Sequence, residues 1–114
     1  MAITSYDDGD RVRLGNHSGN ASTAPFTTVG GAATDPTDVA LTVKAPGAAG
    51  TTTVYRWPTP GTGEVLLSKE DTGRFYADVT LSEPGLWAYR LSGTGAVVAT
   101  EEGVLHVRRS VVAA

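Results

Sequence analysis

Apolar and polar residues alternate along several short stretches of this chain, with the period of two that is typical of a β-strand. The clearest stretch spans residues 38–44, where Val39, Leu41 and Val43 share one face. No window keeps apolar residues at helical spacing, because Gly, Pro and Thr interrupt the chain throughout. Seven strands are therefore predicted, at residues 11–14, 38–44, 51–57, 64–68, 74–81, 86–91 and 96–109.

Residues typical of turns separate these stretches. Turns are expected at residues 46–50, 58–63, 69–73, 83–85 and 92–95, and the last strand is expected to bend near residues 101–103. The segment from 15 to 36 is too long for a hairpin loop. Within it, residues 26–29 form a candidate short strand that continues the first strand on a second sheet.

Seven short strands joined by turns within about a hundred residues are typical of an immunoglobulin-like fold. The sequence therefore predicts an all-β chain, an immunoglobulin-like antiparallel β-sandwich of about seven strands. It is expected to be a single domain over residues 1–114, with flexible arms at 1–5 and 110–114. Ten inward-facing residues are expected to form the core between the sheets: Val39, Leu41, Val43, Phe75, Val79, Trp87, Tyr89, Leu91, Leu105 and Val107.

Composition narrows the classes of function. The 114 residues are 40% hydrophobic, which is enough for one core, and the absence of Cys excludes disulfides and thiolate zinc sites. A formal net charge of -3 argues against nucleic-acid binding, which favours a basic surface. Residues 1–8 lack the basic and apolar regions of a signal peptide, and no apolar run is long enough to cross a membrane.

The residues that commonly carry chemistry are sparse. The carboxylates of Asp7, Asp8 and Asp10 do not have the spacing of a calcium-binding loop, and a solvated lead-in to a strand is the preferred interpretation. His17 and His106 have no companion ligand nearby in sequence, and no Ser has the context of a nucleophile. We therefore expect no catalytic, cofactor-binding or metal-binding residues, no cofactor, and no enzymatic activity.

Aromatic residues support two interpretations. Tyr55, Trp57, Trp87 and Tyr89 alternate on two predicted strands and are candidates for a platform on which sugars stack. The same alternation places an aromatic side chain in the core of a sandwich. Core packing is the preferred interpretation for Trp87, whereas both remain open for Trp57, which ends a strand before Pro58.

Five stretches resemble a group of small immunoglobulin-like proteins encoded by tailed phages and prophages of actinobacteria. They are residues 6–14, 35–43 and 72–79, the Pro-Gly-x-Trp-x-Tyr-Arg pattern within 84–95, and residues 101–103 together with 107–109. The resemblance spans residues 6–109, and the segment 15–24 departs from the group as an apparently extra loop. It implies a structural role in the virion, as a neck or head–tail connector part, a capsid decoration or a tail ornament.

The resemblance thus leads us to expect a head–tail connector or neck component of a tailed phage that acts by protein–protein binding. The alternatives are a capsid decoration or tail ornament, or a cell-surface adhesive or carbohydrate-binding module. Expected partners are other virion proteins (portal or adaptor, capsid or tail subunits) in a symmetric ring or array, with no nucleic-acid specificity and no membrane. The expected location is the virion, after synthesis in the cytoplasm of the host bacterium.

Residues without an assured place in the core, and residues near the chain ends, are the candidates for an interface. They are Ile3, Tyr6, Phe26, Val29, Trp57, Arg108, Arg109, Val111 and Val112.

Overall fold

The computed structural model describes residues 5–7, 9–17, 25–28, 30–46, 52–95 and 99–108, and this part of the chain contains strands and no helix. The strands are β1 (Ser5–Asp7), β2 (Arg11–Gly15), β3 (Asp38–Lys44), β4 (Thr52–Trp57), β5 (Val65–Leu66), β6 (Ser68–Asp71), β7 (Arg74–Thr80), β8 (Gly85–Thr94) and β9 (Ala99–Arg108). The prediction of an all-β chain is confirmed.

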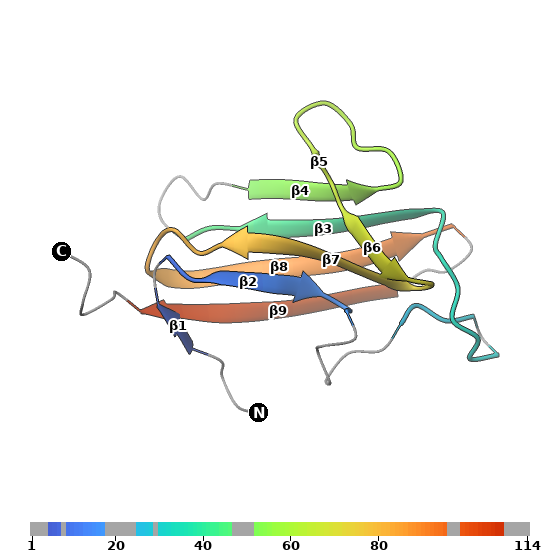
Figure 1. The fold of residues 1–114 in the computed structure, drawn as a ribbon, viewed down its shortest axis with the longest axis horizontal. Coiled ribbons are helices and arrows are strands. Elements are labelled where there is room, and N and C mark those ends of the chain that lie inside the picture. Colours follow the sequence, from blue (N-terminus) through green and yellow to red (C-terminus); the bar gives the residue numbers. More distant parts are fainter. Residues whose placement is uncertain are drawn as a thin grey trace.

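The strands form two sheets that lie one over the other (Figure 1). The larger sheet has six strands in the order β1-β9-β8-β3-β4-β5, and the smaller has three in the order β2-β7-β6. Neighbouring strands are antiparallel except for β1 beside β9 and β5 beside β4, which are parallel. The sheets are therefore mixed, in a sandwich-like arrangement.

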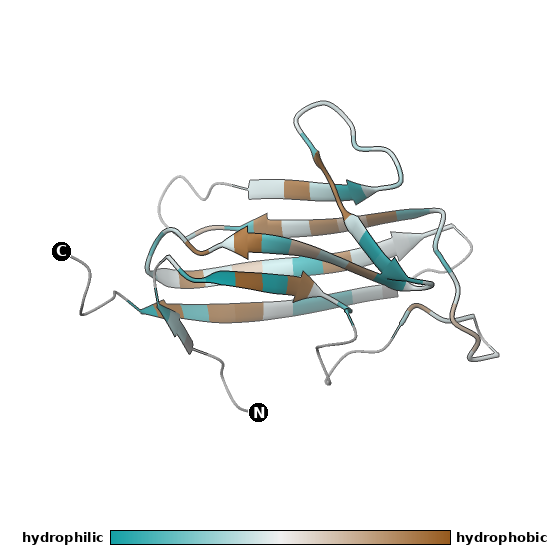
Figure 2. Ribbon diagram, viewed as in Figure 1, coloured by the Kyte–Doolittle hydropathy of each residue, from teal (hydrophilic) through white to brown (hydrophobic). Residues whose placement is uncertain are grey.

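The core lies between the two sheets and follows the alternation in the sequence. Along β3 and β7 every second residue is buried, and Figure 2 shows the matching alternation of hydrophobic and hydrophilic bands on β7. Nine of the ten predicted core residues are buried, and the tenth, Tyr89, packs partly buried against them. Phe75 contacts two other aromatic rings, with centroid distances of 4.9 Å to Trp57 and 6.1 Å to Phe26.

The segment before β3 returns to the core through Phe26. Its side chain is only 7% exposed, and its backbone N–H donates to the carbonyl of Gly73 at 2.9 Å. The predicted strand at 26–29 is reduced to one bridge between Thr27 and Ala33, and the described residues do not extend it along either sheet. Phe26 was predicted as a possible contact residue, and this was wrong because its ring fills the end of the core beside Phe75.

The predicted strand at 64–68 is divided at Leu67. This residue is 1% exposed and lies where the chain passes from β5 on the larger sheet to β6 on the smaller one (Figure 1). Residues 69–71, predicted as part of a turn, belong to β6, and only Thr72 and Gly73 form the turn itself. The side chain of Leu67 is buried where the chain crosses between the sheets. For this reason β5 ends at Leu66, before the predicted end of the strand at residue 68.

The hairpin of β8 and β9 is longer and straighter than predicted. Residues 92–94, expected as a turn, extend β8, and the register runs without interruption from Gly85 opposite Val107 to Gly93 opposite Ala99. The expected bend at 101–103 is therefore not a bulge. Gly103 instead leaves room for a neighbour, because a Cβ atom there would lie 2.5 Å from Cζ of Tyr89.

One residue of the predicted N-terminal arm belongs to a strand. Ser5 belongs to β1, where it pairs with His106 of β9, so it is not part of an arm. The remaining predicted arm residues, 1–4 and 110–114, lie outside the described residues.

Candidate functional site

Four strands end the two sheets, and they differ in how they are protected from further pairing. In the smaller sheet, β6 consists of the exposed polar residues 68–71, and β2 carries Arg13, whose guanidinium donates to Asp78 at 2.9 and 3.2 Å. Charged side chains on an edge strand oppose the addition of another chain. In the larger sheet the short strands β1 and β5 stand at the two edges.

Most of β9 is an open edge. Strand β1 covers only residues 106–108 of β9, so within the described structure no strand pairs with residues 99–105 on the side away from β8. We call these seven residues the β9 edge. An unpaired row of backbone N–H and C=O groups is a template for a strand from another chain. This is the most extensive such template among the described strands.

Two tyrosines and one carboxylate lie beside the β9 edge on the inner side of the sheet. The ring of Tyr89 passes from β8 over Gly103, and Glu101 occupies the next inward position of β9. Burial, and then the nearby Glu101 and Tyr6, raise the pKa of the Tyr89 phenol. Burial also raises the pKa of Glu101, and no basic group of the described chain forms an ion pair with it.

Large apolar side chains are exposed at both edges of the six-stranded sheet. Leu86 on β8 and Val104 on β9 are 52% and 53% exposed, and they are diagonal neighbours on its outer face. At the opposite edge, Val65 and Leu66 of β5 are 47% and 57% exposed, visible as a hydrophobic band in Figure 2. None of these four residues was predicted as a contact residue, although Leu86 and Val104 are recognisable in the sequence as apolar residues out of phase with Trp87 and Leu105.

The structure separates the predicted contact residues. Tyr6 lies on β1 near Tyr89 and packs partly buried against the core, and Trp57 packs on Phe75. Arg108 is exposed and donates to Asp7 at 2.9 Å, which ties the end of β9 to β1. Of the four candidates in the described part of the chain, only Tyr6 therefore lies near Tyr89 beside the β9 edge. The other candidates, Ile3, Val29, Arg109, Val111 and Val112, lie outside the described residues.

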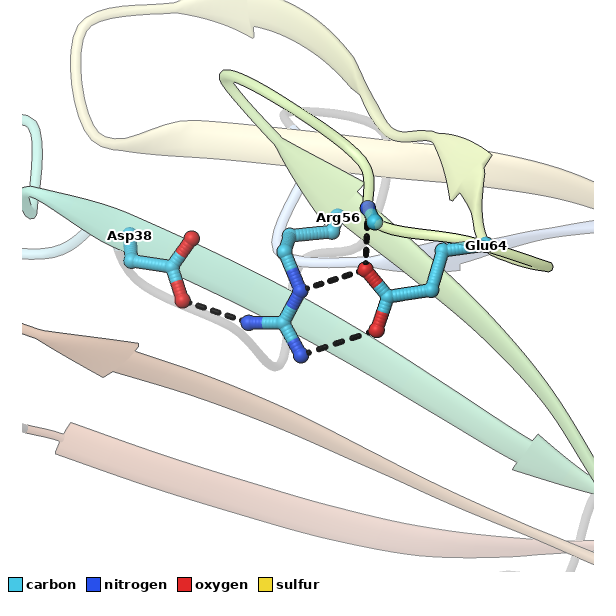
Figure 3. Close-up of polar contacts among 4 residues, drawn as sticks. Asp38, Arg56 and Glu64 are labelled. Atoms are coloured by element: carbon cyan, nitrogen blue, oxygen red, sulfur yellow. Dashed lines mark hydrogen bonds and ion pairs between the residues drawn. The ribbon is translucent and has the colours of Figure 1, made fainter.

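Arg56 on β4 forms ion pairs near the β5 edge of the larger sheet. Its guanidinium donates two hydrogen bonds to Glu64, at 2.7 and 3.1 Å, and a third to Asp38 (Figure 3). Glu64 also accepts the backbone N–H of Gly61 at 2.6 Å. The bidentate pair with Arg56 lowers the pKa of Glu64, and the backbone bond from Gly61 adds to this. These contacts fix residues 61–64 against β4, so we assign them a structural role.

A hollow of about 230 Å³ opens at one end of the sandwich. It is lined by Val43, Ala45, Thr53, Tyr55, Val79, Thr80, Ser82, Glu83 and Trp87. The volume is below the range of roughly 300–1,000 Å³ that is typical of ligand pockets. Trp87 is 6% exposed and its indole N–H donates to the carbonyl of Glu83 at 2.9 Å, so this ring offers little surface for stacking.

The remaining candidates for chemistry are dispersed. Nε2 of His17 lies 3.1 Å from the carbonyl oxygen of Arg13, whereas His106 is exposed on the outer face of β9. The carboxylate of Asp10 accepts the backbone N–H of Asp7 at 2.9 Å, as in a short turn. Among the residues with described positions, no three His, Asp or Glu side chains gather into a metal-binding group, and no helix could span a membrane.

The chain matches no protein-family model and no curated protein sequence.

Proposed function

We propose that this protein is a structural subunit of a tailed-phage virion, most specifically of the neck or head–tail connector, and that it works by binding other virion proteins. The observation that carries the binding role is the β9 edge, an open strand flanked by exposed apolar side chains. The virion assignment comes from the sequence resemblance across residues 6–109. The binding role and the virion assignment both fit a protein whose described features are an open strand edge and exposed apolar side chains.

We further propose that the fold is immunoglobulin-like. In that fold strands A, B, E and D form one sheet, and G, F and C form the other, to which the variable type adds C′. The orders β2-β7-β6 and β9-β8-β3-β4 support this assignment. In this assignment β2 is strand B and β3 is strand C. If the first predicted strand, at residues 11–14, is taken as strand A, the same two strands would be A and B. The difference arises because β1 precedes them. Strand β5 departs from the pattern, since it has two residues and runs parallel to β4.

The two exposed apolar sites support assembly into a ring. One comprises Leu86 and Val104 near β9, and the other comprises Val65 and Leu66 on β5, at the opposite edge of the same sheet. Different surfaces on opposite sides of a protomer permit head-to-tail contacts, which close into rings when the rotation allows. Exposed apolar side chains that gather at a sheet edge are also typical of contact surfaces.

The sugar-binding alternative is favoured by one observation, the hollow at the end of the sandwich. Tyr55, Ser82 and Glu83 provide an aromatic ring, a hydroxyl and a carboxylate there. Such groups fix the orientation of a small polar ligand. A glycan array distinguishes the two proposals. The sugar-binding alternative predicts a glycan that binds the native chain and loses binding on Tyr55→Ala, whereas the virion proposal predicts no such glycan.

The virion proposal is tested with a variant that lacks residues 1–4 and 110–114. If these residues serve contacts with neighbouring proteins, as we propose, the melting temperature is expected to stay close to that of the full chain. Incorporation into particles, measured by quantitative mass spectrometry of purified virions, is expected to fall at least tenfold because the ends contact neighbours. The full chain is the matched control.

Two outcomes contradict this account at different levels. Absence of the full chain from purified particles would overturn the virion role. Incorporation of the shortened chain at the full level would retain that role but show that the ends are passive, so that contacts lie on the sandwich itself.

A further inference from the structure

Within the described structure, the β9 edge combines a row of unpaired backbone groups with a half-buried carboxylate that has no ion-pair partner. Residues 99–105 have no strand on their outer side within the described structure. Glu101 is half-buried on the inner face of this edge, and no described Lys, Arg or His lies within ion-pairing distance of its carboxylate. A partly buried carboxylate is costly to leave without a positively charged partner. This carboxylate therefore favours a positively charged partner.

The ring of Tyr89 lies near Glu101 on the inner face. Gly103, two residues along β9, has no side chain, and the phenol of Tyr89 lies over it, so that the ring reaches the outermost strand of this part of the sheet. Tyr6 on β1 packs, partly buried, against the core. A carboxylate close to a phenol ring suits a Lys or Arg side chain, because the carboxylate pairs with the charge and the ring face attracts it.

We propose that the β9 edge docks an extended segment of a partner protein, which adds as a strand along residues 99–105 and places a Lys or Arg side chain against Glu101 and Tyr89. Alternate residues of an added strand face opposite sides of the sheet. Basic residues of the segment therefore face Glu101 on the inner side, and the residues between them lie beside the exposed Val104 on the outer side.

The charge of the edge selects a basic segment over a second copy of β9. Two β9 edges paired antiparallel about their centre would place Glu102 of one copy directly opposite Glu102 of the other, whereas Glu101 would lie opposite Gly103. Like charges directly opposite in neighbouring strands are destabilising. The directly opposed Glu102 side chains thus oppose self-pairing, and Glu101 on the inner face favours a strand that carries positive charge on that face. This inference concerns the surface alone and does not depend on the virion role.

The test uses a fluorescent seven-residue peptide of alternating valine and arginine, and a matched peptide with glutamate in place of arginine. Binding to the full chain is measured by anisotropy. The arginine peptide is expected to bind at least tenfold more tightly than the glutamate peptide. Glu101→Gln, which keeps the shape of the side chain, is expected to weaken binding at least tenfold. Glu102→Gln, on the outer face of the same strand, is the matched control and is expected to change it less than threefold.

A second measurement separates loss of the charge contact from loss of structure. Raising the salt concentration from 50 to 500 mM is expected to weaken binding to the native chain but to leave the residual binding of Glu101→Gln nearly constant, since salt screens the ion pair. Equal effects of Glu101→Gln and Glu102→Gln would overturn the proposal. So would equal binding of the two peptides, or no binding of the arginine peptide at millimolar concentration.

Discussion

Gly15 ends β2 where no side chain fits. Its φ of +128° lies in a region that residues with a Cβ atom rarely adopt, and a Cβ atom there would overlap the backbone oxygen of Phe75. The next residue, Asn16, is 2% exposed: its side chain donates to the Gly73 carbonyl and accepts the Phe75 N–H, both at 2.8 Å. These two residues fasten the end of β2 to the start of β7.

Gly15→Ala is accordingly expected to destabilise the protein by about 2–4 kcal/mol, the sum of positive-φ strain and overpacking against backbone. Gly31→Ala is the matched control, because Gly31 also has a positive φ of +88° but has nothing within 4 Å of a Cβ atom. The control is expected to cost about 1 kcal/mol, from strain alone. Urea unfolding measures both, and equal losses of stability would contradict the assignment of backbone contact at Gly15.

Strands with clear alternation were predicted at nearly their observed bounds. Residues 38–44 are β3 as predicted, and 74–81 contain β7, because a strand with one buried face must alternate. Residues 64–71 could not be divided from sequence, since three consecutive apolar residues have no single face and 68–71 are all polar. Their division depends on the crossing between sheets at Leu67, which is a property of the tertiary structure. Gly103 likewise suggested a bend in the sequence. In the structure its missing side chain leaves room for the Tyr89 ring of the adjacent strand.

Two arginine–carboxylate pairs connect elements and predict a response to acid. The hydrogen bonds from Arg56 lower the pKa of Glu64, and those from Arg13 lower the pKa of Asp78. A carboxylate whose pKa is lower in the folded state stabilises the fold above its ordinary pKa, near 4.5 for Glu64. That contribution disappears as the pH falls through the lowered pKa.

The melting temperature is therefore expected to fall between pH 5 and pH 2.5. Glu64→Gln has no titrating carboxylate at this position, so its melting temperature is expected to fall less steeply and to approach that of the native chain at the acidic end. Thermal unfolding followed by circular dichroism at half-unit pH steps measures both. Parallel curves for the two proteins would contradict a stabilising role of the Arg56–Glu64 pair.

At the scale of the whole molecule, the sequence predicts that partner proteins bind residues outside the core, but it does not predict which edge of which sheet carries those residues. The order of strands decides which one stands at an edge, and no local pattern in residues 99–105 reveals that β1 covers only the end of β9. Phe26 shows the reverse error, because an apolar residue within a long polar segment looked like a surface residue but fills the core. Tyr6 is the predicted contact residue that lies near Tyr89, beside the β9 edge.

Hydrogen exchange of the backbone amides tests the central claim, that the protein binds its partners by adding a strand to β9. Exchange is compared by mass spectrometry between the free chain and the chain within purified particles. In the free chain, the amides of residues 99–105 that point away from β8 are expected to exchange quickly, because they have no partner within the described structure. In particles they are expected to be protected at least a hundredfold. Protection confined to the smaller sheet, with unchanged exchange at residues 99–105, would contradict the account.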